Sequence, residues 1–65
     1  MITINATGPD GNAFAIMAVV RRILRKQGKT WVEVNAALKL MQASDYDHLC
    51  ETAERVTNGE LEVIK

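Results

Sequence analysis

The chain alternates apolar and polar residues in two short segments, one at each end. The alternating apolar residues are Ile2, Ile4 and Ala6 in the first segment and Leu61 and Val63 in the second. A period of two, with β-branched residues at the apolar positions, predicts half-buried strands over residues 1–6 and after Gly59. An isolated two-stranded ribbon is only marginally stable in water, so the two strands must pack against the segment between them.

Three stretches between the predicted strands repeat their apolar residues every three or four positions, which predicts three helices. Their predicted ranges are residues 13–27, 31–43 and 46–57. Asn12 is a favourable cap for the first helix, and Gly28 follows its predicted end. Thr30 and Glu33 have the spacing of a capping box at the start of the second helix.

Each predicted helix has one apolar face that we expect in the core. These faces contain Phe14, Ile16, Met17, Val20, Ile23 and Leu24 in the first helix, Trp31, Val34, Ala37, Leu38 and Met41 in the second, and Tyr46, Leu49, Cys50, Ala53 and Val56 in the third. Trp31 occupies a first turn, where a large ring is often only partly covered. An exposed tryptophan at this position would anchor an interface.

The order β-α-α-α-β predicts one α+β domain over residues 1–65, with the terminal strands paired and the helices packed on one face. A domain of this size hides only about 60% of the surface of its unfolded chain. One cysteine cannot form an internal disulfide, and the sequence has no Cys/His cluster for zinc. We therefore expect a homodimer in which two chains join edge to edge into a four-stranded sheet.

The charges cancel over the whole chain but not within each half. Residues 1–32 contain five basic residues and one acidic residue, and residues 33–65 contain three basic and seven acidic residues. The halves therefore carry +4 and −4, and each is suited to an oppositely charged surface within the molecule or on a partner. The neutral total charge argues only against generic coating of nucleic acid, so a nucleic-acid partner is the least favoured of the binding hypotheses.

A cluster of cations in the first predicted helix is the leading candidate for a partner-binding surface. Its residues are Arg21, Arg22, Arg25 and Lys26, and we add Trp31 as a candidate anchor. Their spacing places the four cations within two turns of one helix, where phosphate or an acidic protein could dock. The alternative is a solvated helix face partly neutralised by the acidic third helix.

The loop between the first strand and the first helix is a second candidate site, for a small anion. Its residues are Gly8, Asp10, Gly11 and Asn12. Free backbone amides at a helix N-terminus attract negative charge. The loop lacks the GxGxxG spacing and the lysine of a phosphate-binding loop, and Asp10 would repel an anion, so a plain strand-to-helix turn is the alternative.

Other polar residues in the sequence suggest no catalytic or metal site, and we expect no enzyme activity and no cofactor. His48 and Cys50 lie two residues apart and so face different sides of a helix, with no further ligand nearby. Asp45 and Asp47 are suited to the first turn of a helix, where acids favour the dipole. No apolar run is long enough for a membrane span, and no signal peptide is evident, so we expect a cytoplasmic protein without membrane contact.

Two segments resemble a widespread group of small bacteriophage and prophage proteins that have no established activity. The residues that carry the resemblance are Gly8 to Phe14, which read GPDGNAF, together with Met41 and the SDYDHL segment from Ser44 to Leu49. The resemblance implies a phage protein acting in the host cytoplasm, and so an inhibitor that occupies a host enzyme or an anti-phage defence component.

Together, these observations predict a non-enzymatic protein-interaction module. One alternative is a nucleotide or small-anion sponge that uses the Gly8–Asn12 loop and the basic helix together. A regulator that reads nucleic acid with the first helix is the third hypothesis.

Overall fold

The computed structural model describes residues 1–65, apart from the side chain of Asp10. The elements are β1 (Ile2–Asn5), a 3₁₀ turn (Pro9–Gly11), α1 (Ala13–Lys26), α2 (Trp31–Met41), α3 (Tyr46–Val56) and β2 (Leu61–Ile64). This order confirms the predicted β-α-α-α-β arrangement and the α+β class. No helix among the described residues is long and apolar enough to cross a membrane.

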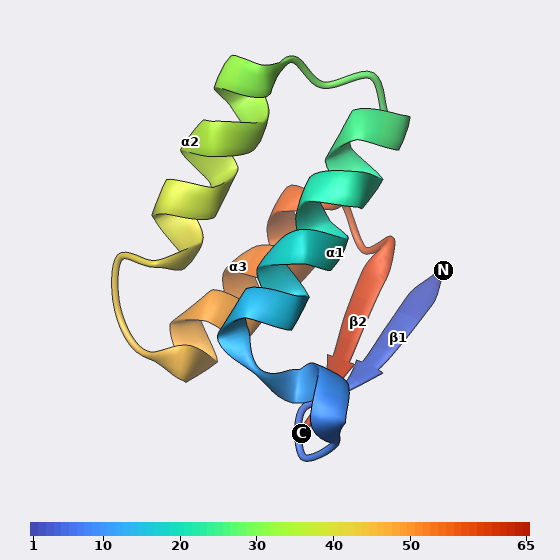
Figure 1. Cartoon of the computed structure of the whole chain (residues 1–65), viewed down its shortest axis with the longest axis vertical. Helices are drawn as coiled ribbons and strands as arrows, with labels where there is room; N and C mark the ends of the chain where they lie inside the picture. Colours follow the sequence, from blue (N-terminus) through green and yellow to red (C-terminus); the bar gives the residue numbers. More distant parts are fainter.

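The two terminal strands pair with each other in parallel, as Figure 1 shows. Ile2 lies opposite Leu61 and Ile4 lies opposite Val63. A parallel pair requires a long crossover, and the three helices supply it by returning the chain to the end at which β1 began. The two halves of the sequence are therefore joined at the sheet.

The core lies between one face of the sheet and the three helices. Ile4, Leu61 and Val63 point into it from the strands. The helices contribute the buried residues Ile16, Val20, Ile23, Leu24, Val34, Met41, Leu49, Cys50 and Ala53. Each fully buried large aliphatic side chain stabilises the fold by about 1.5–3 kcal/mol through removal of apolar surface from water.

Side-chain caps fix where the helices begin. Asn12 accepts a hydrogen bond from the Ala15 amide at 2.8 Å, and Thr30 and Glu33 form the complete capping box. The backbone amide and hydroxyl of Thr30 hold the pKa of the Glu33 carboxyl below its ordinary value. The predicted starts of the first two helices are therefore confirmed.

The helices end one or two residues earlier than their periodicity predicted. The last helical residues are Lys26, Met41 and Val56. Gly28 at the end of α1 and Asn58 and Gly59 beyond α3 have positive φ, which turns the chain out of a right-handed helix.

The predicted core position of Phe14 is wrong, because its side chain is 82% exposed. Ile16, Val20 and Ile23 define the buried face of α1. Phe14 precedes Ile23 by nine residues, about 2.5 helical turns, and therefore lies on the opposite side of the helix. An apolar residue in the first turn was assigned to the wrong face.

Two further aromatic residues that were assigned to apolar faces are only partly covered. Trp31 is 55% exposed and Tyr46 is 38% exposed. Both open their helices, so their rings lie at the rim of the core. For Trp31 this is the partial covering expected of a first-turn residue.

Candidate functional site

The predicted basic residues and Trp31 come together at one place on the surface. They line an open depression of about 540 Å³, together with Ala18. We call this set the basic surface: Arg21, Arg22, Arg25, Lys26 and Trp31. All five side chains are exposed, and they come from α1 and from the first turn of α2.

Arg25 connects the two helices within the basic surface. Its guanidinium carbon lies 4.4 Å from the centre of the Trp31 ring, and its Nη1 donates a hydrogen bond to the Lys29 carbonyl at 2.8 Å. A cation over an exposed aromatic ring contributes about 0.5–1 kcal/mol. The tight turn at Gly28 brings Trp31 back beside α1, so the ring is held in place before any partner binds.

Phe14 extends the same surface along α1, and sequence reasoning missed it. Arg21 and Arg25 follow Phe14 by seven and eleven residues, about two and three full turns, so all three share the outer face of the helix. Ala18 lies between them and lines the depression. The sequence does contain the pattern that would have identified Phe14. Phe14, Arg21 and Arg25 repeat at helical spacing on the face of α1 opposite the buried residues.

The positive charge of the basic surface is not neutralised by direct ion pairs within the described part of the chain. The ion pairs there join the Met1 amino group to Glu60 and Lys65 to Asp47, both at 3.2 Å. The sequence of α1 itself contains no acidic residue. The basic surface therefore produces a local positive field from its four cations. Dissolved salt screens this field over about 8 Å.

The Gly8–Asn12 loop uses many of its backbone amides internally. Gly8 donates to the Asn5 carbonyl and Gly11 donates to the Gly8 carbonyl, both at 3.0 Å. Its cap residue, Asn12, accepts from Ala15. The Asp10 side chain, which the anion-binding hypothesis included, lies outside the described residues. The amides of Gly8 and Gly11 are thus committed to the turn.

Gly11 is required by close packing and not by positive φ. A Cβ at Gly11 would overlap the carbonyl oxygen of Ala6 and lie 2.7 Å from its Cα. Positive φ among the glycines occurs at Gly28 and Gly59. The loop therefore crosses the end of β1 at a distance that only glycine permits.

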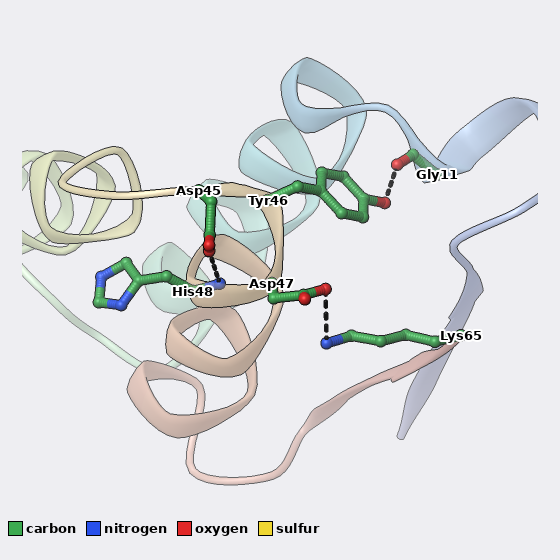
Figure 2. A network of polar contacts seen from close by, with 6 residues as sticks. All are labelled: Gly11, Asp45, Tyr46, Asp47, His48 and Lys65. Atoms are coloured by element: carbon green, nitrogen blue, oxygen red, sulfur yellow. Dashed lines mark hydrogen bonds and ion pairs between the residues drawn. The ribbon is translucent and has the colours of Figure 1, made fainter.

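Tyr46 holds this loop against α3, as Figure 2 shows. Its hydroxyl donates a hydrogen bond to the Gly11 carbonyl. Withdrawal of the hydroxyl from water raises the pKa of Tyr46, and the adjacent Cys50 side chain adds to the rise. The structure thus joins the Gly8–Asn12 loop to α3 through one contact between side chain and backbone.

The loop and the basic surface lie toward opposite ends of α1. The helix has 14 residues and is therefore about 21 Å long. Asn12 precedes its first turn, whereas Arg25 and Lys26 are in its last. A small anion could contact the loop or the last-turn cations, but not both at once.

The remaining polar candidates make contacts that stabilise the fold. Asp45 caps α3 by accepting from the His48 amide at 2.9 Å, and Asp47 pairs with Lys65 (Figure 2). His48 Nε2 lies 2.9 Å from the Leu40 carbonyl oxygen. Cys50 is buried.

No group of three or more His, Cys, Asp or Glu side chains that could hold a metal ion is found among the described residues. Comparison with known proteins found no matching family model, no similar curated protein and no similar solved structure.

Proposed function

We propose that this chain is a non-enzymatic binding module that uses the basic surface and Phe14 to bind an acidic surface on another protein. The observation that carries the proposal is the exposure of Phe14 in line with Arg21 and Arg25 on the outer face of α1. Exposing a phenylalanine to water is unfavourable, and interface cores are enriched in aromatic residues and arginine.

The basic surface and Phe14 together suit a protein partner that contacts a small area of this chain. Phe14 lies in the first turn of α1, and Trp31 of α2 lies against Arg25 in the last turn of α1, with Arg21 between them along the helix. Buried aromatic and arginine side chains are the residues that most often dominate binding energy. The cations would steer an acidic partner toward the surface and speed its association.

The resemblance to phage proteins supports a host protein as the partner. A small chain of 65 residues can act by binding one to one and covering a surface of its partner. The proposed consequence is inhibition of a host enzyme or of a defence component by binding.

The direct experiment compares two double variants that change the net charge equally. Arg21→Glu with Arg22→Glu reverses the basic surface and leaves the Arg25 contacts to Trp31 and Lys29 in place. Lys39→Glu with Arg55→Glu reverses two exposed cations on α2 and α3 as a control. A bacterial protein captured quantitatively by the wild type and by the control, and lost from the first variant, would support the proposal.

A second candidate function is nucleic-acid binding, because Phe14 and Trp31 both expose their rings. Exposed aromatic rings can stack on bases, and arginines can contact phosphate. A long polyanion would, however, also meet the −4 charge of the second half of the chain. Binding to duplex or single-stranded DNA that weakens steeply with added salt would favour this candidate over a protein partner.

A further inference from the structure

The strand β1 exposes one side of its backbone. The amides of Ile2 and Ala6 donate to the carbonyls of Glu60 and Ile64, both at 2.7 Å, so these residues face β2. Successive residues of a strand point their backbone groups to opposite sides, and Thr3 and Asn5 therefore direct their amides away from the sheet. Figure 1 shows β1 as the outer strand with no helix or strand beyond it.

The other edge of the sheet is closed by the chain itself. On the outer side of β2, the Leu61 amide donates to the Thr57 hydroxyl at 3.3 Å, and the Val63 amide donates to the Glu54 carboxylate at 2.8 Å. Both side chains belong to α3 or its C-cap. A further strand can therefore add to the sheet beside β1 but not beside β2.

The open edge lacks the charged residues and the proline that keep many edge strands apart. The sequence of β1 is Ile-Thr-Ile-Asn, without proline, lysine or any other charge. Ile2 is 39% exposed although it faces the helical side of the sheet. It lines a depression of about 270 Å³ together with Ile23, Lys26, Gln27 and Glu60.

We infer that β1 pairs with β1 of a second copy of this chain, antiparallel about a two-fold axis at Thr3. In this register Thr3 and the partner's Thr3 exchange two backbone hydrogen bonds. The Asn5 amide donates to the carbonyl of the partner's Met1, and the symmetric bond forms as well. The Asn5 carbonyl needs no partner, because it already accepts from Gly8 at 3.0 Å.

The side chains fit the same register. Ile2 lies opposite the partner's Ile4 on the helical side, which covers the exposed part of Ile2 and continues the apolar face. On the outer side, Thr3 lies opposite the partner's Thr3, so no charge meets a like charge. The resulting sheet has four strands, with a β2 strand at each outer edge, and its edges are closed by Thr57 and Glu54.

Sedimentation equilibrium over a range of concentrations tests this pairing. The wild type should reach twice the 7.2 kDa mass of one chain. Thr3→Pro removes the outward amide and leaves the bonds between β1 and β2, so the dimer dissociation constant should rise at least about tenfold. Proline at Ile4 would break the internal sheet and would not separate assembly from folding.

A charge at the two-fold axis provides a second variant that keeps the backbone intact. Thr3→Lys places two ammonium groups close to each other across the axis, and their repulsion disfavours the dimer. Within one chain, residue 3 lies opposite Glu62, whose carboxylate attracts the lysine. Ile64→Lys adds the same charge to the same face of β2 and serves as the control, which should remain dimeric. Circular dichroism confirms that each variant is folded.

Amide hydrogen exchange provides an independent readout of the register. In the dimer, the Thr3 and Asn5 amides should exchange at least about tenfold more slowly than in folded Thr3→Lys. A wild-type protein that stays monomeric at every concentration would overturn the pairing. This holds even if the monomer binds an extended peptide along β1. A dimer unaffected by both Thr3 variants, or one with fast exchange at Thr3 and Asn5, would also overturn it.

Discussion

The hydroxyl of Tyr46 donates a hydrogen bond to the carbonyl oxygen of Gly11, which lies 35 residues earlier in the chain. The contact joins the first turn of α3 to the loop that leads from β1 into α1. It therefore holds the segment before α1 against α3.

Removing this hydroxyl should weaken the fold by a small and measurable amount. We expect Tyr46→Phe to lower the free energy of unfolding by about 0.5–1.5 kcal/mol, because the ring packing remains and one hydrogen bond is lost. Urea denaturation followed by Trp31 fluorescence measures the change, since Trp31 is the single tryptophan. Stability equal to that of the wild type would show that the bond to Gly11 contributes nothing.

The two glycines of the loop should respond differently to the same substitution. Gly11→Ala should lower the free energy of unfolding by about 1–3 kcal/mol, because the added methyl group meets the backbone of Ala6. Gly8→Ala is the matched control, with its nearest neighbour the Asn5 carbonyl at 3.4 Å, and should change it by less than about 0.5 kcal/mol. Equal effects in thermal melts would contradict the close approach at Gly11.

The raised pKa of Tyr46 predicts a loss of stability in alkaline solution. Because the folded-state pKa exceeds the ordinary value of 10.0, this group's contribution is complete below that pH and declines as pH rises through the raised value. Lys65, whose pKa is raised by its hydrogen bond to Asp47, acts in the same direction. Tyr46→Phe should therefore show a smaller fall in the free energy of unfolding with rising pH than the wild type, and the difference is the contribution of Tyr46.

Tyrosinate absorbance measures the Tyr46 pKa directly, because the chain has one tyrosine. The folded protein should titrate at higher pH than the chain unfolded in urea. A lower folded-state pKa would contradict the withdrawal of the hydroxyl from water.

Local features of this fold could be predicted from the sequence, because their causes lie within a few residues. The Thr30–Glu33 capping box depends on a three-residue spacing, and Gly28 ends α1 through its own φ. Alternation at both ends predicted the paired strands, although their parallel direction follows from the path of the helices. The clustering of the four cations followed from helical spacing within α1.

Features that depend on distant parts of the chain could not be predicted. The Tyr46–Gly11 bond and the side-chain closure of β2 by Glu54 require the tertiary arrangement. Phe14 was assigned to the wrong face because the spacing of a first-turn residue can fit both the buried face of α1 and its outer face. Its exposure became clear only when Ile16 and Ile23 fixed the buried face.

The most direct measurement of the proposed function is a fluorescence titration of Trp31 with a synthetic acidic helical peptide that also carries leucine. Binding by the wild type should weaken at least about tenfold in Arg21→Glu with Arg22→Glu, and also in Phe14→Ser, while Lys39→Glu with Arg55→Glu binds as the wild type does. Equal affinity in all four proteins, or no binding by the wild type, would contradict the assignment of recognition to this surface.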